Sequence, residues 1–202
     1  MKKIVLASKS PDRSGLLERL GIPFDIFITN VDEKKFKIEF SDATELVKEL
    51  AKAKAEFAKN NISDNGLDKI IIAADTVVEI DGEIIGKALN EEEAFEILKK
   101  LMSKTHKLIT GIAVTQLKNP KVIIDSDTTY VDFLELSDDE IIQYIKNEEW
   151  KGRAGAYSIN DKASVFIYKI NGSSSNVIGL PMHKLFEILK KEFKINLFQL
   201  MS

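Results

Sequence analysis

Hydroxyl and cationic side chains are concentrated in one short segment near the start of the chain, Ser8-Lys9-Ser10-Pro11-Asp12-Arg13. The segment lies between a short apolar run and an amphipathic stretch that stops at Gly21. A serine N-cap, a proline at the first helical position and a glycine stop predict a strand, a tight turn and a helix. Such a turn aims backbone N–H groups and the side chains of Ser8, Lys9, Ser10 and Arg13 at one point, which indicates a phosphate-type anion site. A well-capped helix that binds nothing is the plainer alternative.

Two acidic residues are candidates for metal or proton chemistry. Asp75 follows the apolar run Ile70-Ile71-Ile72-Ala73-Ala74, and α/β folds present functional carboxylates at the ends of such strands. Thr76 adds a hydroxyl beside it. Glu33, in a polar loop after the second expected strand, would supply a second carboxylate to one divalent cation. The plainer alternatives are an aspartate that closes a turn and a glutamate on a surface loop.

A glycine-rich segment, Gly82-Glu83-Ile84-Ile85-Gly86-Lys87, superficially matches a phosphate-binding loop. We exclude that interpretation because three residues instead of four separate the glycines. In addition, Ala88 stands where a Ser or Thr would hold magnesium. Lys87 can still contact a phosphate as a point charge.

Small polar residues form a second cluster, which consists of Gly155 and residues 173–176. Such residues permit close approach of the backbone to a ligand, although residue type alone favours a plain loop. The combination is more informative than any one element. Two hydroxyl-rich turns, a carboxylate at a strand end and several cations together indicate a site for a metal-bound polyphosphate.

The composition restricts the available chemistry. The 202-residue chain contains no cysteine and only two histidines, His106 and His183, which are far apart in sequence. Disulfides, a thiolate nucleophile and a zinc–thiolate site are therefore excluded, and a histidine-based triad or metal centre is not expected. Catalysis must rest on carboxylates, lysines, arginines and hydroxyl groups. The length fits one large domain, or one domain with two lobes.

Charge and hydropathy argue against two classes of partner. The formal net charge is -3 and the lysines are interspersed with acidic residues, so no strong attraction to nucleic acid or to a membrane surface is expected. The apolar run near the N-terminus has only four residues, which is too short for the core of a signal peptide. We therefore expect a cytoplasmic protein without nucleic-acid or membrane partners.

Expected strands and helices alternate along the chain, which indicates an α/β architecture. Residues 77–85 are expected to form a hairpin around Asp81-Gly82, the strongest short-range turn signal in the chain. Two long stretches, residues 106–117 and 122–134, are joined by a short turn, which predicts an antiparallel pair and hence a mixed sheet. The other expected strands cover residues 4–7, 24–29, 70–74 and 165–170, and the expected helices cover residues 10–20, 41–58, 90–102, 137–147 and 181–191.

Six ordered segments resemble the Maf family of nucleoside triphosphate pyrophosphatases across essentially the whole chain. They are Leu6-Ala7-Ser8-Lys9-Ser10-Pro11-Asp12-Arg13, Ala73-Ala74-Asp75-Thr76-Val77-Val78, Gly86-Lys87, Thr110-Gly111, Gly155-Ala156-Tyr157-Ser158-Ile159 and residues 171–181. The resemblance implies a Maf/ITPase-like, elongated two-lobed α/β fold with a central mixed β-sheet flanked by helices. It also implies one domain over residues 1–202 with a cleft between the lobes, and frequent homodimers.

The resemblance further implies the reaction, which is cleavage of a nucleoside triphosphate between the α and β phosphates to give the monophosphate and pyrophosphate. It makes Asp75 the proton acceptor that activates water and lets Asp75 share a divalent cation, Mg²⁺ or Mn²⁺, with Glu33. The triphosphate would be held by Ser8, Ser10, Arg13, Lys54 and Lys87. Without the resemblance, Lys54 would be a solvated lysine among its lysine neighbours.

The resemblance also bears on the base. Pyrimidine-selective members, which act on dTTP and UTP, carry a Gly-Ala-Tyr-x-Ile-Gln segment, and residues 155–159 of this chain match it. Two positions depart from the family pattern. Asp12 replaces the first of two paired arginines, and Asn160 replaces the glutamine, so its hydrogen bonds to a base must shift or pass through water. We expect Arg13, Thr76 and Asn160 to tune base preference.

Two alternatives to a dTTP/UTP pyrophosphatase that cleans the nucleotide pool remain open. Asn160 permits the same chemistry on 7-methyl-GTP or another purine nucleotide. The family resemblance also carries a link to inhibition of septum formation, so the protein could be a nucleotide-binding regulator of cell division without catalysis.

Overall fold

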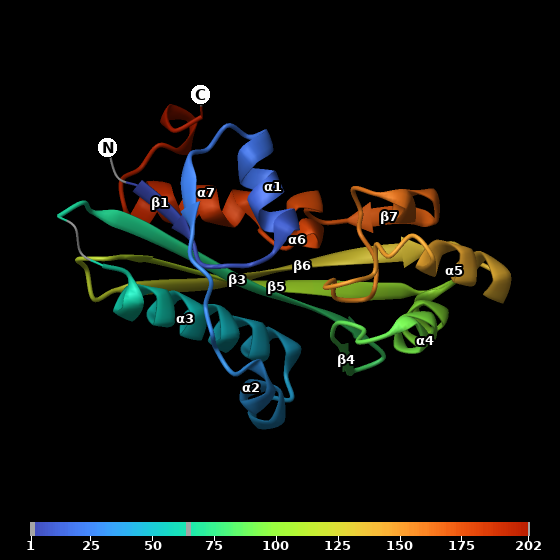
Figure 1. Ribbon diagram of the computed structural model, residues 1–202. Coiled ribbons are helices and arrows are strands. Elements are labelled where there is room, and N and C mark those ends of the chain that lie inside the picture. The colour runs from blue at the N-terminus through green and yellow to red at the C-terminus, as the bar shows by residue number, and fades with distance from the viewer. Residues whose placement is uncertain (1–2, 64–65, 202) are drawn as a thin grey trace. The chain divides into compact units, whose positions relative to one another are not determined.

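Seven strands form one mixed β-sheet in the computed structural model, which describes residues 3–63 and 66–201 (Figure 1). The strands are β1 (Lys3–Leu6), β2 (Phe24–Ile26), β3 (Lys69–Ile80), β4 (Glu83–Ile85), β5 (Thr105–Gln116), β6 (Val122–Phe133) and β7 (Ile167–Asn171). Their order is β2-β1-β3-β5-β6-β7, and β4 pairs with β3. β1 is parallel to β2 and β3, whereas β3–β4 and β6–β7 are antiparallel, so the predicted mixed sheet is confirmed.

Helices alternate with these strands, which confirms the predicted α/β class. They are α1 (Pro11–Arg19), α2 (Glu33–Glu39), α3 (Ala43–Asn61), α4 (Glu91–Leu101), α5 (Asp138–Ile145), α6 (Ser174–Ile178) and α7 (Met182–Glu192), with 3-10 turns η1 (Lys162–Val165) and η2 (Leu197–Gln199). Two helix starts follow the expected chemistry, since Asn90 accepts from the Glu93 N–H and Ser137 forms a capping box with Glu140. No helix among the described residues has the length and hydropathy of a membrane span.

The strand that carries Asp75 is longer than predicted. β3 continues through Asp75 and Thr76 to Ile80, a total of 12 residues, so Asp75 lies inside a strand and does not end one. The prediction was wrong because Val77 and Val78 remain buried and the strand goes on to pair with β4. The hairpin itself is confirmed at Asp81-Gly82, where both residues have positive φ angles, as a tight β-turn requires.

Other boundaries also differ from the prediction. β2 ends at Ile26 instead of residue 29, and β7 begins only after η1. Glu33 does not lie in a loop, because it is the first residue of α2. The Asp32 carboxylate accepts from the Lys34 N–H at 3.1 Å and thereby caps this helix. A cap inside a run of charged residues is hard to distinguish from a surface loop by sequence.

The chain divides into two compact units. The first consists of Met1–Asp75, Thr110–Asp127 and Gly179–Ser202, and the second consists of Thr76–Ile109 and Thr128–Ile178. β3, β5 and β6 contribute residues to both units. The expected single domain with two lobes and a cleft stays a prediction.

The first unit packs α3 closely against the sheet. The alanines Ala51, Ala55 and Ala58 of α3 belong to a buried cluster that also contains residues of β1, β3 and β5. A Cβ atom added to Gly111 of β5 would lie 2.2 Å from the Val47 carbonyl oxygen. α2 and α3 cover one face of this part of the sheet, and α1 and α7 cover the other (Figure 1).

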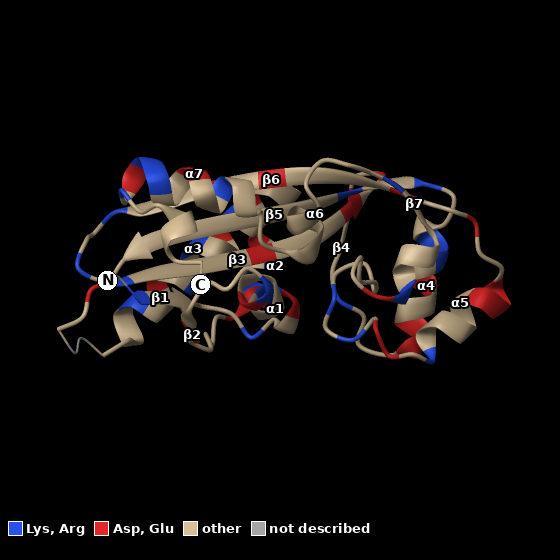
Figure 2. Ribbon diagram, turned by 90° about the horizontal axis from the view of Figure 1, so that it is seen from above, with Lys and Arg blue, Asp and Glu red and all other residues tan. Residues whose placement is uncertain are grey.

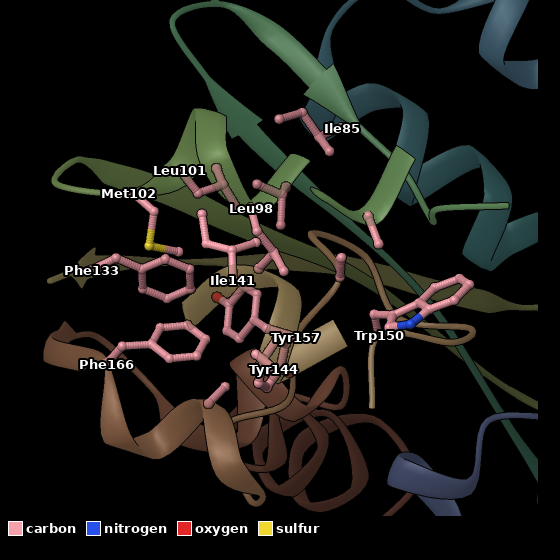
Figure 3. Packing of buried hydrophobic residues seen from close by; sticks show 14 of the residues in the cluster. Ile85, Leu98, Leu101, Met102, Phe133, Ile141, Tyr144, Trp150, Tyr157 and Phe166 are labelled. Carbon is pink, nitrogen blue, oxygen red and sulfur yellow. The ribbon is translucent and has the colours of Figure 1, made fainter. Parts of the chain in front are cut away.

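The second unit has an aromatic core (Figure 3). Phe133 packs edge-to-face on Phe166 at a centroid distance of 5.0 Å and on Tyr157 at 4.8 Å. Tyr144 packs on Phe166 at 5.2 Å in the same way. These rings lie beside the aliphatic side chains of α4 and α5 in one cluster (Figure 3).

Charged residues of both signs share the helix surfaces, as α4 and α7 show (Figure 2). Lys99 of α4 pairs with Asp138 of α5 at 2.9 Å, and Lys191 pairs with Glu187 on α7 at 2.8 Å. These pairs agree with the interspersed charges expected from the sequence, and exposed pairs of this kind contribute little to stability.

Candidate active site

A lysine between two carboxylates is the centre of the site in the first unit. The Lys54 ammonium lies 2.5 Å from Asp75 Oδ1 and 2.7 Å from Glu33 Oε1. The side chains of Lys54 and Asp75 are 10% and 13% exposed, and that of Glu33 is 35% exposed. The pairing to Asp75 is therefore largely removed from water, where charge–charge interactions are strengthened. The structure brings together three residues that are distant in sequence.

The fold of α3 explains why Lys54 points inward. Asp42 caps the helix by accepting from the Glu45 N–H at 2.8 Å. Lys54 then falls on the same stripe as the buried residues Ala51 and Ala58, at helical spacing. The plainer alternative of a solvated lysine is therefore excluded. Helical periodicity was the signal that could have identified Lys54 without any family resemblance.

Arg13 and Ser8 form the second part of the site in this unit. Arg13 is buried, its Nε donates to the Gly179 carbonyl oxygen at 2.7 Å, and its Nη1 donates to Ser8 Oγ at 3.2 Å. The Ser10 N–H donates to the same Ser8 oxygen at 3.1 Å. Ser10 occupies the N-cap position of α1 as predicted, but its side chain makes no capping hydrogen bond. The turn is therefore organised around the Ser8 hydroxyl.

Electrostatics connect Arg13 to the carboxylates. Burial lowers the pKa of the Arg13 guanidinium, and the negative charges of Asp75, Glu33 and Asp12 oppose that shift. An arginine retains its charge even so. Asp12, which replaces an arginine of the family pattern, thus acts on Arg13 as a neighbouring negative charge. Arg13, Lys54, Asp75 and Glu33 thus form an ion cluster of two cations and two carboxylates, and Asp12 adds a further negative charge near Arg13.

This donor set fits a hard divalent cation that is shared with a ligand. Among the described residues, no group of three or more His, Cys, Asp and Glu side chains could hold a metal. Glu33 and Asp75 supply only carboxylate oxygens, and both already face one positive charge at Lys54. Mg²⁺ is commonly held by one or two carboxylates together with substrate phosphates, so two carboxylates suffice.

The remaining predicted site residues belong to the second unit. Thr76 follows Asp75 in β3. Successive side chains of a strand point to opposite faces of the sheet, so the Thr76 side chain lies on the face opposite to that of Asp75. Lys87 follows β4 and forms an isolated β-bridge with Ala154. Asn160 is exposed and lies in a turn.

The second cluster of small polar residues has a structural explanation. Residues 174–178 form α6 instead of a loop, and the buried Asn176 donates to the Leu108 carbonyl oxygen and to Thr129 Oγ1, each at 3.0 Å. The Ser173 N–H donates to the same threonine oxygen. A Cβ atom on Gly172 would lie 2.7 Å from it. These contacts attach α6 to β5 and β6, so small residues are required here for packing.

The chain is similar to known proteins over nearly its whole length. A family model described as Maf-like protein matches residues 3–192. A protein of Alkaliphilus oremlandii named dTTP/UTP pyrophosphatase is 45% identical over 98% of this chain and 100% of its own length. Proteins of the same name from Caldanaerobacter subterraneus and Caldicellulosiruptor saccharolyticus are 44% and 42% identical, over 96% and 95% of this chain and 90% and 95% of their own.

A solved structure of a nucleoside triphosphatase, also described as a dITP/XTP pyrophosphatase, from Mycobacterium abscessus is a much weaker match. It has 12% sequence identity and a TM-score of 0.30, over 65% of this chain and 72% of that one. The sequence relatives are therefore the informative ones.

Proposed function

The chain belongs to the Maf-like family over residues 3–192, and from that membership we propose that it is a nucleoside triphosphate pyrophosphatase acting on dTTP and UTP. It would convert them to the monophosphate and pyrophosphate and so clean the nucleotide pool. The observation that supports this most directly is the ion cluster of Arg13, Lys54, Asp75 and Glu33, because it combines buried cations, which a triphosphate requires, with carboxylates. This membership favours dTTP and UTP over the purine alternative, because the relatives are named for those substrates.

Asp75 is the residue we assign to proton transfer. Its ion pair with Lys54 requires the carboxylate form, and a carboxylate can accept a proton from water. Asp75 lies within β3 and contacts the buried Lys54 ammonium, and such support of the carboxylate favours this assignment. Attack of that water on the α-phosphorus releases pyrophosphate as the leaving group.

The triphosphate would be bound by the cations of the first unit and the start of α1. Arg13 and Lys54 supply fixed positive charge, and the turn at Ser8 and Ser10 supplies hydroxyls next to the N-terminal end of a helix. Lys87 would contribute a further point charge from the second unit. Phosphoryl transfer depends mainly on such positioning and charge stabilisation.

We propose that Glu33 and Asp75 hold a divalent cation, Mg²⁺ or Mn²⁺, which would neutralise charge on the phosphates. Lys54 contacts both carboxylates, so it must give up at least part of these contacts when the cation binds. The Lys54 ammonium would then be able to pair with phosphate oxygens of the substrate instead. Base preference would be set by Arg13, Thr76 and Asn160.

An assay of purified protein with Mg²⁺ tests this proposal. The substrates are dTTP, UTP, CTP, GTP and 7-methyl-GTP, each with and without added inorganic pyrophosphatase. Orthophosphate that appears only with the coupling enzyme, and fastest with dTTP or UTP, is the expected result. Orthophosphate as the primary product would contradict the proposed cleavage site. The fastest turnover with 7-methyl-GTP would support the purine alternative, and binding without turnover would support the regulatory one.

The predicted homodimer and cytoplasmic location also enter the proposal. Light scattering of the purified protein and fractionation of cells that contain it would test them. A monomer at all concentrations, or recovery outside the cytoplasm, would contradict them.

A further inference from the structure

A buried histidine in the second unit has no role in the proposed chemistry. His106 lies on β5 and is 1% exposed, and its Nε2 is 2.9 Å from the Tyr157 hydroxyl. We propose that His106 and Tyr157 are a positioning pair that fixes the loop of residues 154–160 and thereby sets the base selectivity of the enzyme. The inference rests on the proposed function, because it assigns that loop to base recognition.

The loop has a backbone conformation that needs support. Gly155 has φ of 72° and Ala156 has φ of 61°, so two successive residues are left-handed. For Ala156 this conformation is unfavourable, because it carries a Cβ atom. Strained residues of this kind persist only where the surroundings impose them. Glycine is required at 155 for a second reason, since a Cβ atom there would lie 2.8 Å from a methyl group of Val78.

Two sets of contacts impose the conformation. On one side, the Gly155 N–H donates to the Gly86 carbonyl oxygen at 3.1 Å, and Ala154 forms a β-bridge with Lys87. On the other side, the Tyr157 ring is buried, and Figure 3 shows it within the hydrophobic cluster. The loop is therefore held by the backbone next to Lys87 and by the tyrosine side chain.

Among the contacts of Tyr157, His106 supplies the hydrogen bond, which is the directional one. Its ring packs edge-to-face on Tyr157 at 5.5 Å and on Phe133 at 4.7 Å. Burial lowers the pKa of His106 to about 4, against the opposing charge of Asp132, so the ring is neutral at pH 7. Its Nδ1 has no hydrogen-bond partner among the described residues, so the tyrosine hydroxyl is the polar contact that the imidazole makes. Packing alone would let the phenol ring slide, whereas this hydrogen bond fixes the position of its end.

The two residues proposed to contact the base and the phosphate lie at opposite ends of this loop. Asn160, the residue proposed to contact the base, lies three residues after Tyr157 and is exposed. Lys87, proposed to contact phosphate, is bridged to Ala154 at the other end of the loop. A loop that is free to relax at Tyr157 would therefore lose the fixed relation between base contact and phosphate contact. Discrimination between bases depends strongly on the relative positions of these two contacts, whereas hydrolysis itself depends on them less.

The test uses Tyr157→Phe, His106→Leu and the double variant. Tyr157→Phe should reduce the ratio of kcat/KM for dTTP to that for CTP by about tenfold, chiefly through KM, because a buried polar partner is lost. Phe166→Leu is the matched control, since it removes a ring packed on Phe133 and Tyr144 instead of on Tyr157. It should lower Tm and leave the ratio unchanged.

The double variant separates positioning from structure. Replacing both polar partners by apolar groups should recover much of the Tm, because no buried polar atom of the pair remains unpaired. The selectivity ratio should stay low, because the directional contact is still absent. Recovery of the ratio together with Tm would overturn the positioning role, and so would an unchanged ratio in Tyr157→Phe.

Binding of the α,β-methylene analogues of dTTP and CTP, measured by calorimetry, separates this inference from the proposed function. A wild-type protein that hydrolyses nothing, but binds the dTTP analogue selectively and loses that selectivity in Tyr157→Phe, would contradict the function and support the inference. Hydrolysis with a selectivity that Tyr157→Phe does not change would do the reverse. A wild-type protein that hydrolyses none of the substrates and binds neither analogue would overturn both.

Discussion

The two units bury polar groups of different kinds. In the first unit, Arg13, Lys54 and Asp75 are buried as charges and compensate one another. In the second unit, the buried pair is His106 and Tyr157, which are both neutral at pH 7, and burial moves the pKa of each further from that pH by lowering that of the histidine and raising that of the tyrosine. Buried charges are tolerated only when paired, whereas a neutral hydrogen-bonded pair can lie inside an apolar core. The first unit is thus suited to charge chemistry and the second to shape and recognition.

The two units also differ in how their cores pack, with small residues in the first and large rings in the second. The alanine face of α3 lets the helix approach β5 so closely that Gly111 has no room for a side chain. This approach brings Lys54, whose side chain is long, to Asp75 on the sheet. The second unit instead fills its core with rings that meet edge-to-face around Phe133. Large aromatic rings can pack together in few arrangements, which favours a single conformation of the loop of residues 154–160 that carries Tyr157.

The largest expected effect is on catalysis in the first unit. Asp75→Asn removes the proton acceptor and should reduce kcat for dTTP by about 10³-fold, within the range of general-base catalysis. Glu79→Gln is the control, since Glu79 lies on the same strand and pairs with Lys107 at 2.8 Å. Its kcat should stay near that of the wild type. Steady-state kinetics at pH 7.5 would be the measurement, and an active Asp75→Asn protein would mean that another group takes the proton.

Close packing in the first unit predicts the next effect. Gly111→Ala places a methyl group against the Val47 carbonyl, which is backbone and cannot rotate away, so it should lower the free energy of unfolding by about 3 kcal/mol. Gly15→Ala is the matched control, because a Cβ atom there meets open space within α1 and should stabilise by about 0.5–1 kcal/mol. Urea denaturation measures both. Equal stability of the two variants would mean that α3 can move off the sheet at little cost.

The sequence predicted the class of the fold because its signals are local. Hairpin and capping chemistry at Asp81-Gly82, Asn90 and Ser137 depends on near neighbours, and the structure confirms all three. The extent of β3 was not predicted because a polar pair, Asp75-Thr76, resembles a strand end, whereas the strand continues through the buried Val77 and Val78 to pair with β4. The ion pair of Asp75 with Lys54 joins two elements that are distant in sequence, so the pairing itself was not predictable, although helical spacing marks Lys54 as inward-facing.

The candidate site was predictable in part for the same reason. Ser8 and Arg13 are close in sequence, and the structure joins them by a hydrogen bond. The polar segment suggested Glu33 and the family resemblance suggested Lys54, but only the fold shows that they contact each other. The catalytic and binding roles stay predictions. His106 was passed over because a lone histidine in a β-rich stretch has no sequence pattern that reveals its partner 51 residues away.

The neutral pair of the second unit predicts a pH effect. The pKa of His106 is lowered to about 4 by burial, below the usual 6.5, so the unfolded chain binds more protons between these values. The contribution of neutral His106 is therefore complete above pH 6.5 and is lost as the pH falls toward 4, by about 3 kcal/mol in total. Urea titrations across this window, in wild type and His106→Leu, would measure it. The variant should show a shallower dependence, and identical slopes would contradict a buried neutral ring.

The ion cluster of the first unit gives the smallest and most discriminating prediction. Lys54→Met leaves Asp75 and Glu33 without their shared ammonium and should lower the free energy of unfolding by about 2 kcal/mol, less than for a fully buried pair because Glu33 is partly exposed. Lys52→Met, which breaks the more exposed pair with Glu49, is the control and should have little effect.

Added Mn²⁺ makes this test specific to the cluster. A divalent cation that binds Glu33 and Asp75 replaces the missing positive charge, so Mn²⁺ should raise the Tm of Lys54→Met more than that of the wild type, in which the ammonium competes for the same oxygens. The second unit offers no such response, so Tyr157→Phe should gain no more from Mn²⁺ than the wild type does. Equal Mn²⁺ shifts in Lys54→Met and wild type would show that the two carboxylates are not the cation site. The charged unit would then differ from the neutral one in substrate binding but not in metal binding.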